Sequence, residues 1–169
     1  MVRFFYLQIF LREMYGNCTV CGNLYSIPVY VSGNHVTSYN MADVLGDGTV
    51  SYDPTTNTLT LNGYRGSDIY METSLNILLL GENTIETDNY GILCYFHAGT
   101  VNISGTGSLD IISAYEPITT SGDSVTLTIG GSATLNLMGA EEGWNLYETL
   151  NQSEGFLPSE VIFVCKDHT

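Results

Sequence analysis

The chain has 169 residues, a formal net charge of −14 and only four Lys or Arg residues. A chain of this length can form one domain that buries a core without obligatory disulfides or metal. Because phosphate binding needs clustered Lys and Arg, the composition excludes a nucleic-acid partner and disfavours an anionic membrane surface. No run approaches the roughly 20 apolar residues of a membrane span, so no membrane insertion is predicted.

Residues 1–23 differ from the rest of the chain. They hold two of the four basic residues and two of the four cysteines, and they carry no repeat. The apolar run 4–11 is no convincing signal peptide, because it is short, ends at Arg12 and Glu13, and precedes no small-residue cleavage site. We expect this segment to cap one end of the fold, where open strand edges would otherwise be exposed.

The stretch 25–36 alternates apolar and polar residues. Ile27, Val29 and Val31 are followed by Ser-Gly-Asn-His. This pattern predicts a β-hairpin. We expect its turn at residues 33–34 and the return strand from Val36.

A pattern of alternating β-formers interrupted by Gly repeats along the chain that follows. The positions of Ile77, Leu79, Gly81 and Ile85 recur 24 residues later, and those of Val101 and Ile103 recur after a further 24. An earlier copy, 59–63, precedes residues 77–81 by 18, and Leu135 follows Leu109 after a slip of two. A period of about 20 to 25 residues is typical of stacked supersecondary units. The sequence therefore predicts an all-β fold, a right-handed parallel β-helix (β-solenoid) of about four short coils.

Each coil is predicted to contain three short strands, which are stabilised by stacking on their equivalents in the next coil. In the second and third coils these strands are expected at 76–80, 84–86, 91–93, 100–103, 108–111 and around Ile118. The positions expected to face inward are Ile77, Leu79, Ile85, Ile92, Val101, Ile103, Leu109, Ile111, Ile118, Val125, Leu127, Ile129, Leu135 and Leu137.

The last part of the chain follows the final repeat. Residues 141–150 suit a short helix, and residues 161–164, which follow Pro158, suit a strand. We expect this part to close the far end of the fold. The predicted organisation is thus an N-terminal cap segment at 1–23, the β-solenoid at 24–139 and a C-terminal capping segment at 140–169.

Two motifs carry a family resemblance. Residues 46–53 read Gly-Asp-Gly-Thr-Val-Ser-Tyr-Asp, and residues 58–61 read Thr-Leu-Thr-Leu. With the coils behind them, they resemble the bacterial carbohydrate-binding domain-containing cell-surface proteins, over about residues 25–139. The resemblance implies a parallel β-helix of pectin-lyase-like shape, an extracellular or cell-surface location, and glycan binding by the family as a whole. It supplies no binding residues that can be placed on this sequence.

Tyrosines recur at nearly the interval of the repeat. Tyr64, Tyr90 and Tyr115 follow one another at separations of 26 and 25, with Tyr70 and Tyr95 nearby. If the coils stack in register, these rings form a column along one edge. Sugar rings pack their apolar faces on aromatic planes, so the five tyrosines are the candidate ligand-binding residues. The alternative is that stacked rings only stabilise the corners of the coils.

Catalysis is not predicted. Arg65 is the only Lys or Arg of residues 24–139, whereas lyases of similar shape use a basic residue to abstract a proton. Glycoside hydrolases need two carboxylates roughly 5 to 9.5 Å apart. Glu86 and Asp110 are the pair expected to lie closest, because Ile85 and Leu109 are equivalent in the repeat. We expect these carboxylates to be solvated on the outer face.

No cofactor is predicted, although zinc has candidate ligands. Structural zinc is held by close pairs of Cys and His. The close pairs in this chain are Cys18 with Cys21, Cys94 with His97, and Cys165 with His168. Because the first pair lies far from the second in the sequence, buried or free thiols are expected instead.

Calcium also has candidate ligands. Asp43, Asp47 and Asp53 surround a Gly turn and offer the hard oxygen atoms that calcium prefers. Their spacing matches no EF-hand loop. We therefore expect general acidity at this place, with an ordered calcium ion as the alternative.

The sequence as a whole predicts a non-catalytic glycan-binding or adhesive module of a bacterial surface protein. A neutral polysaccharide is the favoured partner, because an anionic glycan would be repelled by the net charge of −14. The alternative is a structural spacer or protein-interaction solenoid without sugar affinity, whose partner is a surface protein. A glycoside-active enzyme is the third possibility.

Overall fold

The chain is all-β over the residues that the computed structural model describes, which are 26–121, 124–139 and the strand 160–165. These residues form fifteen strands and no helix. The strands are β1 (Ser26–Val31), β2 (Asn34–Thr37), β3 (Val50–Asp53), β4 (Thr58–Asn62), β5 (Arg65–Gly66), β6 (Ile69–Met71), β7 (Leu75–Leu80), β8 (Glu82–Thr87), β9 (Ile92–Cys94), β10 (Ala98–Gly105), β11 (Ser108–Ser113), β12 (Ile118–Thr120), β13 (Ser124–Ile129), β14 (Thr134–Gly139) and β15 (Glu160–Cys165). The predicted N-terminal cap at 1–23 and the predicted helix at 141–150 lie outside the described residues.

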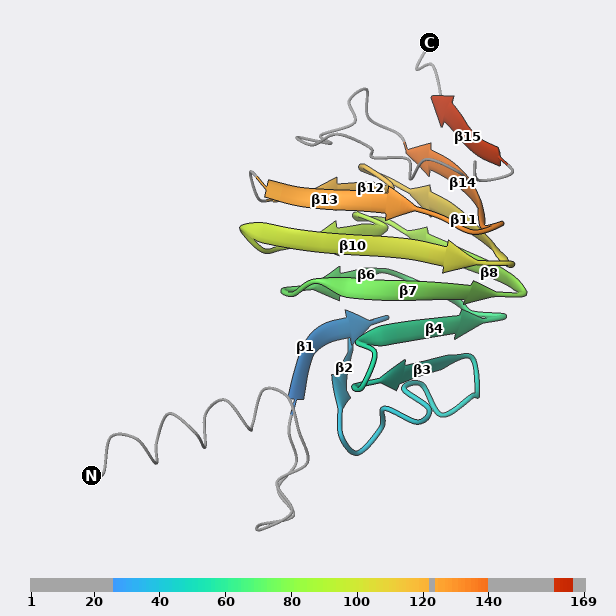
Figure 1. Cartoon of the computed structure of the whole chain (residues 1–169). Coiled ribbons are helices and arrows are strands. Elements are labelled where there is room, and N and C mark those ends of the chain that lie inside the picture. The colour runs from blue at the N-terminus through green and yellow to red at the C-terminus, as the bar shows by residue number, and fades with distance from the viewer. Residues whose placement is uncertain (1–25, 122–123, 140–159, 166–169) are drawn as a thin grey trace.

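Consecutive strands from β4 to β14 enter three different five-stranded sheets in turn (Figure 1). Sheet A has the strand order β12-β9-β6-β1-β2, sheet B has β13-β10-β7-β4-β3, and sheet C has β15-β14-β11-β8-β5. Pairing is parallel throughout sheet C and from β4 to β13 in sheet B. The strand expected at 161–164 is confirmed as β15, which pairs with β14.

The first part of the described chain departs from this parallel pattern. β1 pairs antiparallel with both β2 and β6, and β3 pairs antiparallel with β4. Sheet A is parallel only among β6, β9 and β12. The hairpin therefore adds two strands to one side of sheet A, and of these only β1 runs opposite to β6, β9 and β12.

The step between paired positions from β7 onwards is 26, as from Asn76 to Asn102, so the predicted step of 24 is wrong. Leu75, Val101 and Leu127 accordingly lie directly opposite one another on β7, β10 and β13. An offset of two keeps every side chain on the same face of a strand, so alternation alone cannot distinguish 24 from 26. The shorter step of 18, from Leu59 to Ile77, is confirmed.

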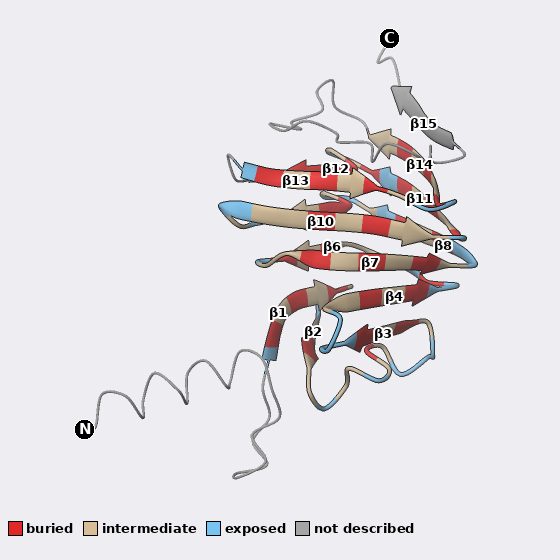
Figure 2. Cartoon of the chain, viewed as in Figure 1, coloured by how far each residue is buried: buried red, intermediate tan, exposed pale blue. Residues whose placement is uncertain are grey.

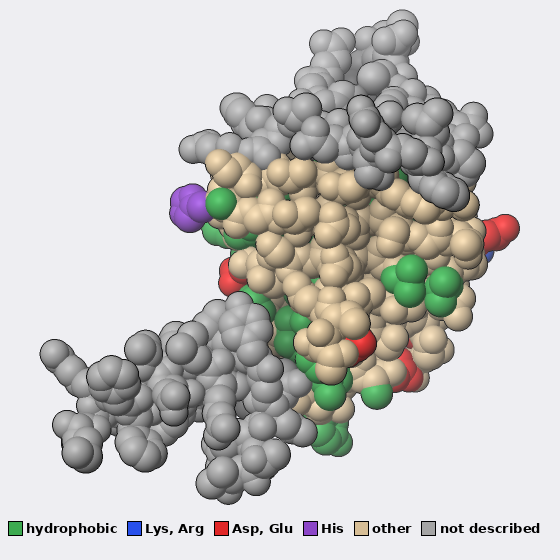
Figure 3. Space-filling model, viewed as in Figure 1, with side chains coloured by type: hydrophobic (Ala, Val, Ile, Leu, Met, Phe, Trp, Pro, Cys, Tyr) green, Lys and Arg blue, Asp and Glu red, His purple; other side chains and the backbone are tan. Residues whose placement is uncertain are grey.

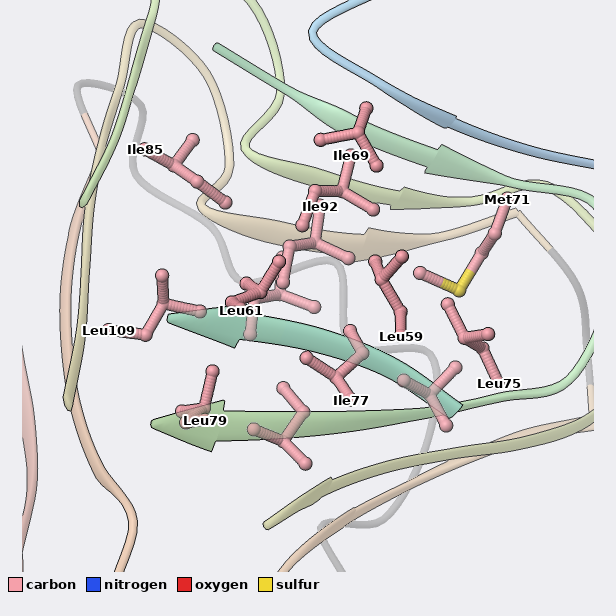
Figure 4. Close-up of a cluster of buried hydrophobic side chains, with 14 of the residues drawn as sticks. Leu59, Leu61, Ile69, Met71, Leu75, Ile77, Leu79, Ile85, Ile92 and Leu109 are labelled. Atoms are coloured by element: carbon pink, nitrogen blue, oxygen red, sulfur yellow. The ribbon is translucent and has the colours of Figure 1, made fainter. Parts of the chain in front are cut away.

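The predicted strands of the second and third coils are present as β7 to β12, with ends that differ slightly from those expected. Every predicted inward position is buried, with at most 5 % of its surface exposed. Figure 2 shows buried and more exposed residues alternating along the strands, and Figure 4 shows labelled Leu, Ile and Met side chains pointing toward one another. Each such side chain contributes about 1.5–3 kcal/mol through removal from water.

The predicted hairpin is confirmed, but its turn is one residue earlier than expected. Val31 pairs with Asn34, so the turn residues are Ser32 and Gly33 rather than residues 33–34. Their φ angles of 47° and 71° are both positive, as a type I′ turn requires. The Ser32 hydroxyl forms a hydrogen bond of 2.7 Å with the Tyr64 hydroxyl, which helps to hold Ser32 in this uncommon conformation.

Substitution of Gly107 tests the observed register. A Cβ atom at Gly107 would collide with the backbone carbonyl oxygen of Gly81, its equivalent in the preceding coil. Because backbone atoms cannot move aside without separating the coils, we expect Gly107→Ala to lower the free energy of unfolding by about 2 kcal/mol. Denaturant-induced unfolding measures this change.

Gly130 is the matched control. A Cβ atom there meets nothing within 4 Å, and the residue does not have a positive φ. We expect Gly130→Ala to leave the free energy of unfolding unchanged or to raise it by up to about 1 kcal/mol. Equal stability of the two variants would contradict the register.

Candidate functional site

Tyr64 does not share a column with Tyr90 and Tyr115. Its side chain is fully buried, and its backbone N–H donates to Asn83 Oδ1 at 3.0 Å. Burial is the main cause that raises the Tyr64 pKa, so the phenol stays neutral. The strand that follows Tyr64 is β5, and it pairs with β8 after a step of only 19, since Arg65 lies opposite Thr84. Because this step is shorter than the separation of 26 between Tyr64 and Tyr90, the two tyrosines do not occupy equivalent positions.

The other four predicted tyrosines fall into two groups. Tyr90 and Tyr115 lie in the turns before β9 and β12, with ring centroids 5.4 Å apart and ring planes 35° apart. Tyr115 is exposed and Tyr90 is half-buried. Tyr70 and Tyr95 lie elsewhere, on the outer side of sheet A, with their centroids 6.2 Å apart. The structure thus brings the predicted residues together in pairs rather than in one column.

The pair on sheet A belongs to a longer row. Tyr30 on β1 lies 5.6 Å from Tyr70, and it stacks on His35 of β2 at 4.3 Å with an interplanar angle of 11°. We call Tyr30, His35, Tyr70 and Tyr95 the aromatic strip. Each is at least partly exposed and lies next to a buried residue in the sequence, so the strip occupies the outer face of sheet A.

The sequence analysis missed Tyr30 and His35. Both belong to the hairpin, which lies outside the repeat and joins sheet A by antiparallel pairing of Tyr30 with Tyr70. One signal was available, since Tyr30 lies between the inward-facing Val29 and Val31 and must therefore face outward. The repeat does not indicate which sheet the hairpin joins.

A groove of about 510 Å³ opens beside the aromatic strip. Its lining includes the aromatic and polar residues Tyr30, His35, Tyr52, Asn57, Glu72 and Ser74. The Tyr52 hydroxyl donates to Asn57 Oδ1 at 2.8 Å, and the Asn57 amide donates to the Ser74 carbonyl oxygen at 2.7 Å. These bonds hold one wall of the groove in a fixed arrangement.

Glu72 links the groove to the aromatic strip. Its side chain is exposed, and its Oε1 accepts a hydrogen bond of 2.5 Å from the Tyr70 hydroxyl. This bond is the main cause that raises the pKa of Tyr70 to about 12, so the phenol keeps its proton. Arg65 is the only Lys or Arg among the described residues, and it lies on β5 in sheet C.

The candidate zinc ligands that the structure describes are not arranged for metal binding. Cys94 is a buried free thiol, whereas His97 is exposed. Burial raises the pKa of Cys94 to about 12, which disfavours the thiolate that zinc needs. The side chains of Cys18, Cys21, Cys165 and His168 lie outside those described.

The three aspartates considered for calcium cap turns of the loops on either side of β3. Asp43 Oδ1 accepts hydrogen bonds from the backbone N–H groups of Gly46, Asp47 and Gly48. The side-chain hydrogen bond from Thr49 is the main cause that lowers the Asp47 pKa, and Thr55 acts in the same way on the Asp53 pKa. Within the described ranges, no group of three or more His, Cys, Asp or Glu side chains is placed to hold a metal ion.

Glu86 and Asp110 are not opposite each other. Asp110 pairs with Thr84, and Glu86 pairs with Ile112, because the step is 26 rather than 24. Asp110 Oδ1 instead accepts a hydrogen bond of 2.5 Å from the Asn136 amide. The register that suggested this carboxylate pair is therefore wrong.

Comparison with protein-family models, curated proteins and solved structures finds no match to the chain. The part of the chain that the structure describes includes no helix long and apolar enough to cross a membrane.

The buried environment of Cys94 predicts low reactivity. A rise of its pKa from 9.0 to about 12 lowers the thiolate fraction near neutral pH about a thousandfold, and the thiolate is the species that alkylating reagents attack. We expect iodoacetamide to leave Cys94 unmodified in the folded protein and to modify it in denaturant. Peptide-resolved mass spectrometry separates Cys94 from the other cysteines, and equal modification in both conditions would contradict the burial.

The hydroxyl of Tyr64 is predicted to contribute to stability. Tyr64→Phe removes its hydrogen bond to Ser32 and keeps the ring, so we expect the free energy of unfolding to fall by about 1 kcal/mol. Tyr39→Phe is the control, because Tyr39 is 89 % exposed. Denaturant-induced unfolding measures both, and an unchanged Tyr64→Phe variant would show that the bond is not stabilising.

Proposed function

We propose that the protein is a non-catalytic glycan-binding or adhesive module of a bacterial surface protein, built as a right-handed parallel β-solenoid of about four coils. The same parallel step of 26, repeated in all three sheets, supports the solenoid. Right-handedness is favoured because parallel crossover connections are right-handed in about 98 % of cases. An extracellular or cell-surface location follows from the family resemblance and belongs to the same proposal.

The observation that carries the proposed binding function is the aromatic strip beside the groove. Rings that are partly exposed and 5.6 and 6.2 Å apart offer successive surfaces on which the apolar faces of sugar rings can pack. Polar groups of Asn57, Glu72 and Ser74 lie within the same groove, where sugar hydroxyls can bond to them. A neutral polysaccharide fits a groove whose described lining includes no Lys or Arg side chain.

We infer binding without catalysis because the site has a single carboxylate. Glu72 is the only Asp or Glu among the described residues that line the groove. Glycoside hydrolysis needs a second carboxylate across the scissile bond. A glycoside-active enzyme is accordingly the less favoured use of this site.

A spacer or protein-interaction solenoid is the second candidate, and the outer face of sheet B favours it. β4, β7, β10 and β13 contain no charged residue. Figure 3 shows this face as mostly uncharged polar surface with a few hydrophobic side chains. A surface protein could approach it without the repulsion that the net charge of −14 imposes on the molecule as a whole.

Removal of two rings of the aromatic strip tests the glycan-binding proposal. We expect Tyr70→Ala/Tyr95→Ala to weaken binding to neutral glycans about tenfold or more, since each stacked ring contributes about 0.5–1.5 kcal/mol. Tyr90→Ala/Tyr115→Ala is the matched control, because it removes the other close pair of rings. A glycan array identifies a ligand, and affinity electrophoresis compares the variants.

The possible outcomes separate the alternatives. If the unmodified protein binds no glycan, the proposed function fails, and a pulldown of surface proteins then tests the second candidate. If only Tyr90→Ala/Tyr115→Ala loses binding, the site lies at the other pair of rings. Unchanged binding by Tyr70→Ala/Tyr95→Ala would exclude the aromatic strip.

A further inference from the structure

Glu72 lies within a group of aromatic side chains. Its backbone N–H donates to the Pro28 carbonyl oxygen at 2.9 Å, which places it beside β1 and Tyr30. On the other side, the backbone N–H of Tyr95 donates to the carbonyl oxygen of Met71, the residue before Glu72, at 2.7 Å. The hydroxyl of Tyr70, two residues earlier in the chain, donates to one carboxylate oxygen. Glu72 thus lies between Pro28 of β1 and Tyr95, with its carboxylate bound to Tyr70.

The carboxylate of Glu72 has no positively charged partner among the described residues. Its side-chain hydrogen bond comes from the neutral Tyr70 hydroxyl, and Arg65, the one described Lys or Arg, lies in a different sheet. Tyr70 cannot supply a compensating charge, because a phenol is neutral or negative. The second carboxylate oxygen therefore remains available to a ligand at the groove.

A carboxylate beside aromatic rings is a site for a cation. The faces of tyrosine rings attract an ammonium group electrostatically, and a nearby carboxylate adds a direct charge interaction. The net charge of −14 raises the local concentration of cations around the whole molecule. A neutral sugar would use the rings but would leave the charge of Glu72 without a counterpart.

We propose that the glycan bound at this site carries free amino groups and that Glu72 selects them. This inference rests on the proposed glycan-binding function, but it replaces the neutral polysaccharide by one whose amino sugars are not acetylated. The rings of the strip follow one another across neighbouring strands, which fits a linear polymer of rings better than a basic peptide. Glu72 is the residue that distinguishes an ammonium group from a neutral amide at the same position of the sugar.

Matched oligosaccharides test the selection. Glucosamine oligomers with free amino groups are compared with fully N-acetylated oligomers of the same length by affinity electrophoresis, at low salt and at a pH at which the amino groups are protonated. We expect the unmodified protein to bind the amino form about fivefold more tightly, and the preference to shrink as salt is added.

Two variants with the same change in net charge isolate the role of Glu72. Glu72→Gln should abolish the preference and leave binding of the N-acetylated oligomer unchanged, because the Gln carbonyl oxygen still accepts the bond from Tyr70. Glu86→Gln removes an exposed carboxylate of sheet C and should keep the preference. A preference that survives in Glu72→Gln would overturn the proposal.

Other results distinguish this inference from the function on which it rests. Equal binding of both oligomers by the unmodified protein would overturn the selection of amino groups and leave glycan binding intact. If neither oligomer nor any neutral glycan binds, the proposed function itself fails. A lysine oligopeptide that binds more tightly than the amino oligomer and loses this binding in Glu72→Gln would replace the glycan by a basic peptide, and would overturn the proposal.

Discussion

Parallel backbone pairing between strands three apart in the chain, from β4 with β7 to β11 with β14, is the interaction on which the rest of the structure depends. The strands are short, so none could be stable without the strands on either side. In-register pairing also places like side chains together, as in the hydrogen bond of 2.8 Å from the Asn102 amide to Asn76 Oδ1. It leaves no space above Gly81, so Gly107 has to be a glycine. The same register of 26 residues therefore determines both the side-chain hydrogen bond and the close backbone contact between neighbouring strands.

The strands, their inward faces and their stacking could be predicted from alternation, but the register could not. A shift of two positions preserves which face is buried, so the inward set was correct although the step was wrong. Residues at the turns and on the outer face indicate the correct step. Gly81 and Gly107, like Asn76 and Asn102, are separated by the true step of 26, and both pairs meet in the structure.

The candidate site could be predicted less well because it forms where the repeat ends. The hairpin joins sheet A by antiparallel pairing, which brings Tyr30 opposite Tyr70 although the two rings share no repeat interval. Tyr64 shows the opposite case. Its spacing from Tyr90 matches the repeat, but the shorter step between β5 and β8 gives it a different place, where its side chain is buried. Sequence periodicity predicts contacts between equivalent strands, whereas the proposed binding surface depends on pairing between unlike strands.

Where the charged residues lie on the surface matters more for ligand binding than the net charge of the molecule. The net charge of −14 argues against anionic ligands anywhere on the molecule, but it does not distinguish one face from another. Sheet B presents four strands without a charged residue, whereas the carboxylate of Glu72 accepts a hydrogen bond from Tyr70 of the aromatic strip on sheet A. Rings alone accept any sugar with an apolar face. In the proposed site, the single carboxylate beside the rings would add a preference for a positively charged sugar.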